Sequence, residues 1–443
     1  MRRILHDLKP SYEHSKSYVE FSLPSSQHDL PCIYQTGDQI KGDIFFKPCR
    51  DIILRNVCIT FEGTTPRDVD AINIVANVLG ICIGITKATI WEPNIETRTG
   101  CPCTTQRFMR LNQPVDEPLL SEGMVLEPGR TYRLPFLFVV PSGLLPQACQ
   151  HPCEHTEIKC HHLNLPPSLG LGFYPNPKGK NRFSSSLEPD TASIAYAIRF
   201  TAIEVKRETN LPITSVDRAH KIHVLPKLPE MPPILIPGDN TTYQLSKVIA
   251  VKQLNREKLG RLTATASQPK AIQLGQIHSR PMQPTPTMLA INFEFLSVNH
   301  NRSPPKPKKI QSKLNAVTHF GIEPYEDLPD RIQQRYLYPR HRSFCRNITL
   351  SSPDIISVHW VKQCSEMDGT ASGENKNVVY TASISLPIVL PENVVYTPTF
   401  FSCLVSRTYS LRVDAFFNKV PFMSKVSLTI PIQICSDIAS EQN

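Results

Sequence analysis

The chain contains little glycine and no long segment with sustained helical periodicity. Glycine accounts for 18 of its 443 residues, whereas proline accounts for 41. Because proline breaks helix interiors and is tolerated at strand ends, this balance favours short strands over long helices. A chain of this length suits two or three domains. We therefore predict a mostly β protein with more than one domain.

Features of secreted proteins and of common enzymes are also missing. The first 16 residues, MRRILHDLKPSYEHSK, lack an apolar core as long as that of a signal peptide. We expect a protein that is not secreted, with most of its 13 cysteines reduced and buried. The chain has no Gly-x-Ser-x-Gly, no phosphate-binding P-loop and no His-Glu-x-x-His. We therefore expect no catalytic activity and no cofactor.

One apolar stretch, residues 72–90, resembles a membrane segment in composition. It reads INIVANVLGICIGITKATI, and Asn73, Asn77 and Lys87 interrupt it. Its uninterrupted apolar part is shorter than the roughly 20 residues that a membrane-spanning helix needs. We expect a buried strand or a short core helix here.

Alternation of apolar and polar residues marks the opening of the chain, between Thr36 and Gly63. The apolar positions are Ile40, Ile44 and Phe46 in one run, and Ile53, Val57, Ile59 and Phe61 in the next. A glycine-containing turn bounds the segment at each end. This pattern is typical of half-buried antiparallel strands.

Further strands are predicted along the rest of the chain. One lies at 17–23, another at 131–141 ends in a proline, and strong alternation marks 192–205. Residues 64–106 look irregular, and residues 165–190 are rich in turn-forming residues and are predicted as a loop. After a segment with five prolines, VLPKLPEMPPILIPG, a second set of short strands begins.

This organisation predicts two domains. We place an N-terminal extension at 1–16, a first β-sandwich at 17–226, a Pro-rich linker at 227–237, a second β-sandwich at 238–436 and a short tail at 437–443. The predicted fold class is all-β, with two tandem immunoglobulin-like β-sandwiches joined by a Pro-rich hinge.

Several motifs, in order, resemble those of the arrestin family and of fungal α-arrestins in particular. The opening has a Gly-Asp turn at Gly37, a second strand glycine at Gly42 and a Phe-Glu-Gly corner ending at Gly63. The later motifs are TYRLPFLFVVPSGLLPQAC, HHLNLPPSLG, KLGRLTATASQPKAIQL, and YSLRVDAFF followed by SKVSLTIPIQI. The resemblance covers about residues 17 to 436 and implies the two arrestin-type β-sandwich domains.

The resemblance also implies a function. Such proteins are adaptors that bind the cytosolic tails of membrane transporters or receptors and link them to ubiquitination and endocytic trafficking. They are cytoplasmic and act peripherally at the plasma membrane or endosomes. Many recruit ubiquitin ligases through Pro-Pro-x-Tyr motifs, which dock as extended polyproline segments.

Two features depart from that family pattern. The Pro-Pro pairs at 166–167, 232–233 and 304–305 are followed by Leu169, Leu235 and Pro307 where the motif requires tyrosine. We therefore expect any ubiquitin ligase to be recruited through another adaptor. Residues 23–26, just after the first strand, read LPSS and lack the basic pair of receptor-binding arrestins. A phosphate-triggered release of that kind is not expected.

A run of basic residues is the candidate binding site. Its members are Arg302, Lys306, Lys308, Lys309 and Lys313. The segment contains no acid, and the net charge of the chain is +9, so an acidic tail or an anionic membrane surface is an expected partner. A solvated loop between two strands is the alternative interpretation.

Cysteine and histidine cluster in residues 149–162, CQHPCEHTEIKCHH. Thiolate and imidazole are the ligands that zinc prefers, and four of them can close a tetrahedral site. However, no second pair of ligands follows at the spacing of a zinc finger. We expect buried thiols and a group of loop histidines, with no metal. The residues leave open whether Cys149, Cys153, Cys160 and His162 bind zinc.

Two other functions are considered. The basic charge suggests a β-sandwich that binds nucleic acid, although the basic run lacks interleaved aromatic residues, which makes nucleic acid an unfavoured partner. The Cys/His cluster suggests a zinc-containing enzyme. Metal analysis and salt-dependent affinity distinguish these from an adaptor.

Overall fold

The structure is a computed structural model that describes most of the chain. The described residues are 17–23, 32–67, 104–113, 123–170, 187, 192–206, 209, 211–234, 236, 242–252, 258–274, 284–298, 303–329, 341–350, 358–364, 378–392, 394–418 and 425–436. The extension at 1–16, the apolar stretch at 72–90, Arg302 and the tail at 437–443 lie outside them. Among the described residues, no helix has the length and apolar composition needed to cross a membrane.

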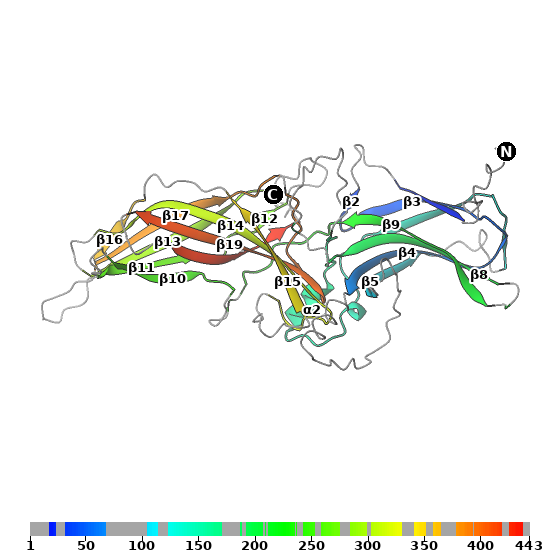
Figure 1. Cartoon of the computed structure of the whole chain (residues 1–443), viewed down its shortest axis with the longest axis horizontal. Coiled ribbons are helices and arrows are strands. Elements are labelled where there is room, and N and C mark those ends of the chain that lie inside the picture. Colours follow the sequence, from blue (N-terminus) through cyan, green and yellow to red (C-terminus); the bar gives the residue numbers. More distant parts are fainter. Residues whose placement is uncertain are drawn as a thin grey trace, which may run out of the picture.

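The N-terminal sheets form the right-hand part of Figure 1. A three-stranded sheet has the order β1-β3-β7, and a six-stranded sheet has the order β2-β9-β8-β4-β5 with β6 beside β4. The strands are β1 (Tyr18–Ser22), β2 (Ile33–Tyr34), β3 (Gln39–Lys47), β4 (Ile52–Arg67), β5 (Thr104–Gln113), β6 (Val125–Leu126), β7 (Tyr132–Val139), β8 (Ala195–Val205) and β9 (Pro212–Val224). A 3-10 turn, η2 (Pro146–Ala148), and a helix, α2 (Thr156–Leu163), lie between β7 and β8 in sequence.

The C-terminal sheets form the left-hand part of Figure 1. One five-stranded sheet has the order β10-β11-β13-β17-β16, and the other has β15-β14-β19-β18 with β20 beside β19. The strands are β10 (Ser246–Lys252), β11 (Lys258–Ala266), β12 (Ile272–Gln273), β13 (Thr287–Ser297), β14 (Lys306–Gly321), β15 (His341–Thr349), β16 (Val361–Cys364), β17 (Val378–Ile388), β18 (Phe400–Phe401), β19 (Val405–Asn418), β20 (Val426–Ile432) and β21 (Ile434–Cys435). The prediction of an all-β chain is therefore confirmed.

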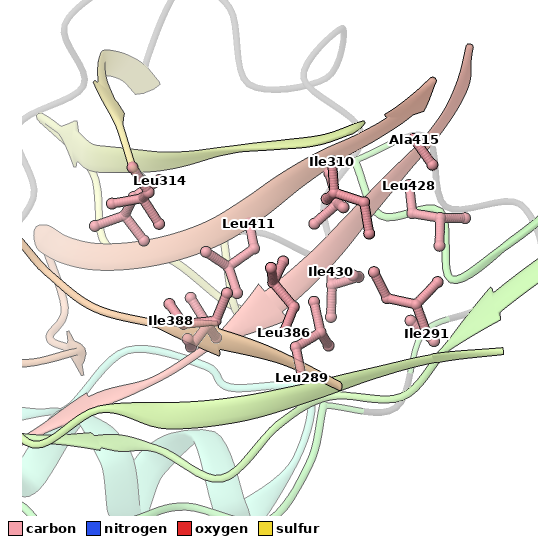
Figure 2. Packing of buried hydrophobic residues seen from close by; sticks show 14 of the residues in the cluster. Leu289, Ile291, Ile310, Leu314, Leu386, Ile388, Leu411, Ala415, Leu428 and Ile430 are labelled. Carbon is pink, nitrogen blue, oxygen red and sulfur yellow. The ribbon is translucent and has the colours of Figure 1, made fainter. Parts of the chain in front are cut away.

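Each group of sheets encloses its own hydrophobic core. In the C-terminal group, Leu289 and Ile388 from one sheet face Leu314 and Leu411 from the other (Figure 2). In the N-terminal group, the buried residues come from β3 and β7 on one side and from β4, β8 and β9 on the other. This second core also takes in Phe400 and two neighbours from the C-terminal half, so apolar packing continues across the junction.

The predicted alternation places side chains correctly in most of the opening strands. Ile40 and Ile44 of β3 are fully buried, as are Tyr196, Ile198, Phe200 and Ala202 on one face of β8. In β4, however, Ile52 and Leu54 point into the core, and Ile53, predicted to do so, is only half-buried. The pairing of β4 with β8 shifts by one residue after Leu54, and such a bulge reverses the face on which the following residues lie.

Two expected irregular segments contain strands. β4 continues to Arg67 and β5 begins at Thr104, so both ends of the segment 64–106 are extended and paired with each other. A register shift follows Gly63, which allows the chain to continue past the predicted corner. β15 likewise begins at His341, within the polar segment 323–343 (EPYEDLPDRIQQRYLYPRHRS), which its composition predicts to be a loop. Backbone hydrogen bonds to neighbouring strands extend these strands through polar residues. Apolar and polar residues do not alternate there, so the sequence gives no period-two signal.

Three strand glycines lie under aromatic rings of neighbouring strands. Phe136 covers Gly42, Phe108 covers Gly63 and Phe295 covers Gly260. A Cβ atom at Gly63 would lie 2.5 Å from the ring of Phe108 and 3.1 Å from that of Tyr196. A ring can lie flat over a glycine because no side chain stands between it and the backbone. Two glycines of the opening motif thus have a packing role.

Substituting Gly63 with alanine should lower the free energy of unfolding by about 1–2 kcal/mol, because the added methyl group overlaps the Phe108 ring. Urea denaturation followed by circular dichroism measures this. The double variant Gly63→Ala/Phe108→Leu removes the overlapping ring and should lose less stability than the two single changes added together. Strict additivity would contradict the packing role of the glycine.

The Pro-rich linker is bonded to the residues that follow β20. Met231 N donates to Gln433 Oε1 at 2.8 Å, and Gln433 Nε2 donates back to Met231 O at 3.0 Å. Leu228 N donates to Ser436 Oγ, whose hydroxyl donates to Pro226 O. A hinge motion at this segment would have to break these bonds, and Gln433 and Ser436 are buried.

Candidate functional site

The predicted basic run lies on β14, the strand between β15 and β19. Lys306, Lys308 and Lys313 are exposed and Lys309 is half-buried. The alternative of a solvated loop does not apply to these four residues, because they belong to a strand paired with β19. A register shift between Pro307 and Lys309 disturbs the alternation at the start of the strand.

Two cations stand directly opposite each other on the outer face of this sheet. Lys313 on β14 pairs in register with Arg412 on β19, and both side chains are exposed. Their neighbours Leu314 and Leu411 point the other way, into the core. Like charges placed opposite each other on adjacent strands destabilise a sheet. A bound anion would reduce the repulsion between Lys313 and Arg412.

Asp414 is the one acidic residue within β14, β15, β19 and β20. Its carboxylate accepts a hydrogen bond from the Ser427 hydroxyl at 2.6 Å and pairs with Lys425 at 2.9 Å and Arg412 at 3.6 Å. Burial acts to raise the pKa of Asp414, but these partners outweigh it and hold the pKa below its usual value. The carboxylate thus already has Ser427, Lys425 and Arg412 as partners, and among the described residues Asp414 forms its ion pairs with Lys425 and Arg412.

The strand β15 forms one edge of the same sheet. Within the described residues it pairs with β14 on one side only, and it contains three basic residues counting His341 and no acid. The Arg346 guanidinium lies 4.9 Å from the centre of the Phe344 ring, an arrangement that attracts a cation to the face of an aromatic ring. An edge strand offers free backbone donors and acceptors to an extended partner.

The Cys/His cluster comes together at the junction between the two groups of sheets, beside α2 (Figure 1). Cys149 Sγ lies 3.3 Å from His151 Nε2, 3.8 Å from His162 Nδ1 and 3.9 Å from Cys153 Sγ. Cys160 is exposed and takes no part. Three of the four predicted residues therefore meet.

Local structure explains why the cluster forms. The chain turns at η2, and α2 then runs for eight residues with Glu157 in its first turn and two histidines in its last turn. An acidic residue near a helix N-terminus suits the helix dipole, as Glu157 does here. The buried residues of α2 are Ile158 and His162, one turn apart, so His162 faces inward towards Cys149.

The environment of the cluster is apolar. Burial, then the neighbouring His151 and His161, lowers the pKa of His162 to about 4. Burial, then Cys149, raises the pKa of the Cys153 thiol to about 11. In the absence of a further charge, the imidazole is neutral with a lone pair available, and this thiol is protonated. In these states His162 is a weak base and Cys153 is not a thiolate nucleophile.

Cys403, from the turn between β18 and β19, completes the group and was not predicted. The ligand atoms of Cys149, His151, His162 and Cys403 all lie within 4.8 Å of one another. Cys403 lies far from residues 149–162 in sequence and has no local motif. Only the contact between the two halves of the chain brings it there, so a spacing rule could not have found it.

Comparisons with known proteins do not assign the chain to a family. No model of a known protein family matches it, and no curated protein matches it.

Proposed function

We propose that this protein is an arrestin-like adaptor with two tandem immunoglobulin-like β-sandwiches. In this proposal it binds acidic cytosolic tails of membrane transporters or receptors and links them to ubiquitination and endocytic trafficking. The ordered motifs of the sequence support it, as do the all-β fold and the two separate cores. The proposed role is one of binding, without catalysis.

One observation carries the proposal: Lys313 and Arg412 stand opposite each other on an exposed sheet face, and Asp414, which pairs with Arg412 at 3.6 Å, is the one acid on the four strands of that region. Lys309 lies on the same strand, and Lys425 flanks the same face beside Asp414. Carboxylates or phosphates of a partner would remove the repulsion between the two opposed cations. Charge-assisted hydrogen bonds of this kind are about twice as strong as neutral ones. We name these four residues, Lys309, Lys313, Arg412 and Lys425, the basic face.

The partner would bind as an extended strand. The free edge of β15 faces away from β14, so a tail that pairs with β15 through backbone hydrogen bonds would be separated from the basic face by β15, and its acidic side chains would have to reach across that strand. Backbone pairing tolerates many sequences, whereas the basic face selects acidic or phosphorylated ones. An adaptor for several membrane proteins needs both properties. In the absence of a Pro-Pro-x-Tyr motif, a separate adaptor would supply the ubiquitin ligase.

A direct binding assay tests the basic face. The probe is a fluorescein-labelled extended peptide rich in glutamate and phosphoserine, and fluorescence anisotropy with the full chain gives its Kd. Lys313→Glu should weaken binding about tenfold or more, because it replaces an attractive contact by a repulsive one. The matched control is Lys252→Glu, an exposed lysine on β10 of the other sheet, which should change Kd by less than about twofold.

An equal loss of affinity in Lys313→Glu and Lys252→Glu would show that binding depends only on the net charge of the protein. That result would contradict the proposed binding role of the basic face. A DNA duplex and anionic phosphatidylserine vesicles, tested in parallel, separate the alternatives. Tighter binding to DNA with a steep salt dependence would support the nucleic-acid alternative. Proximity labelling in the native cell tests the adaptor role itself. Membrane transporters together with ubiquitin-ligase components are the expected neighbours, and a nuclear set would contradict the role.

A further inference from the structure

We propose that Cys149, His151, His162 and Cys403 bind a zinc ion that ties the two halves of the chain together. This site goes beyond the adaptor function and does not depend on it. Its ligand atoms lie within 4.8 Å of one another and come from the turn after η2, from the last turn of α2 and from the β18–β19 turn.

The distances suit tetrahedral zinc. With zinc–sulfur and zinc–nitrogen bonds of about 2.3 and 2.0–2.1 Å, a tetrahedron separates a sulfur from a nitrogen by about 3.6 Å. Cys149 Sγ lies 3.3 Å from His151 Nε2 and 3.8 Å from His162 Nδ1. Both values lie close to the tetrahedral separation, so small side-chain adjustments would bring these three atoms onto one ion.

The two histidines present the correct atoms. His151 Nδ1 lies 2.8 Å from Pro152 O. Because a carbonyl oxygen can only accept, Nδ1 carries the proton and donates a hydrogen bond to it. The lone pair of Nε2 is therefore free on the side that faces Cys149. A hydrogen bond from the second ring nitrogen to a carbonyl is the usual way in which proteins orient a histidine that binds a metal. His162 is almost fully buried, at 1% exposure, with Nδ1 towards the sulfur atoms.

The donor set selects the metal. Two thiolates and two imidazoles are a structural zinc set, and magnesium or calcium would require oxygen ligands. Cys149 is fully buried and four protein ligands fill a tetrahedron, which leaves no open position for substrate. Such a site stabilises structure and does not support a zinc enzyme of the kind considered from the sequence.

A fifth donor, Cys153, lies next to the group. Its Sγ is 3.9 Å from Cys149 Sγ and 3.9 Å from His162 Nδ1. It is outside the set of four whose atoms all approach one another. Cys153 also packs beside Ile158, Leu328 and Phe401, and this apolar contact accounts for its position without a ligand role. A variant at Cys153 therefore separates the proposed ligand set from its closest neighbour.

A zinc ion at this site would join the N-terminal and C-terminal halves of the chain. Three ligands belong to the N-terminal half and Cys403 belongs to the C-terminal half. Nearby, Tyr325 N donates to Cys403 O, and Glu154 N donates to Glu326 O, both at 2.9 Å. Zinc would add a strong bond to this set of weaker contacts and hold the two halves at one angle. Metal binding would then be coupled to the relative position of the sheets.

Metal content of the full chain is measured first. Protein expressed with zinc and dialysed against metal-free buffer should retain one zinc ion per chain, as measured by elemental mass spectrometry. Exchange for cobalt should give the visible bands of tetrahedral Co²⁺ and a sulfur-to-cobalt charge-transfer band whose intensity corresponds to two thiolates. A strong chelator should lower the Tm by about 5 °C or more.

The variants assign the ligands. Cys403→Ser and His162→Asn should each lose the metal, whereas Cys153→Ser should retain it with the same cobalt spectrum. Cys160→Ser, an exposed cysteine on α2, is the matched control and should behave as the parent chain. If a ligand variant fails to fold, the thiolate count from the cobalt spectrum of the parent chain decides the set.

Three results would overturn the proposal. They are a parent chain that binds neither zinc nor cobalt, a Cys149–Cys153 disulfide in freshly isolated protein, or a cobalt spectrum with three thiolates that is lost in Cys153→Ser. The last result would replace a proposed ligand by Cys153.

Discussion

Replacing Phe295 with alanine should lower the free energy of unfolding by about 3–5 kcal/mol. The side chain of Phe295 is fully buried on β13 and covers Gly260 on the neighbouring strand β11. On the other side it pairs in register with Tyr380 of β17, with ring centres 6.4 Å apart. Truncation leaves a cavity lined by three strands, and the uncovered glycine has no side chain to fill it.

The matched control is Met288→Ala on the same strand. Met288 is 55% exposed and points away from the core, so its loss should cost less than about 0.5 kcal/mol. Urea denaturation of both variants, followed by tryptophan fluorescence and circular dichroism, measures the difference. If the two groups of sheets unfold separately, only one transition should shift. Equal costs for the two variants would contradict the placement of the C-terminal core.

The second large effect is expected at Glu62, the acid of the Phe-Glu-Gly corner. Its side chain is 4% exposed and lies among three arginines, with Arg199 Nε at 3.2 Å, Arg107 Nε at 3.5 Å and Arg110 Nε at 3.7 Å. The Thr60 hydroxyl donates a further hydrogen bond at 3.0 Å. The carboxylate is therefore a negative centre shared by three like charges on adjacent strands, of which Arg199 also pairs with Asp217 at 2.6 Å.

Glu62→Gln should cost about 2–3 kcal/mol, because it keeps the shape of the side chain and removes the acid that Arg107, Arg110 and Arg199 share, so that Arg199 keeps Asp217 as its carboxylate partner. This expected cost is lower than the roughly 3–5 kcal/mol for breaking a fully buried ion pair, because the arginines are partly exposed to solvent. Glu127→Gln is the control, since Glu127 is 65% exposed and, within the described part of the chain, forms its ion pair with Arg130. Thermal unfolding at low and high salt measures both. A loss at Glu62 no larger than at Glu127 would show that the arginine cluster is solvated and needs no counter-ion.

Local patterns predicted the strands well. Alternation in β3, β8 and β13 is a property of neighbouring residues, because successive side chains of a strand point to opposite faces. The interior positions Ile40, Tyr196 and Phe200 followed directly from it. The helix α2 gave no such signal, since only Ile158 and His162 of its eight residues are buried. Two positions are too few to establish a helical period.

The candidate sites depended on the tertiary structure more than the strands did. The sequence by itself determined an all-β chain, two sets of strands and a cysteine- and histidine-rich segment, because these are encoded in adjacent residues. Only the tertiary structure decided that Lys313 opposes Arg412, that Glu62 meets Arg199, and that Cys403 reaches Cys149. Each of these contacts joins segments far apart in the chain. Their positions follow from strand register and from packing between the two halves, which no local spacing specifies.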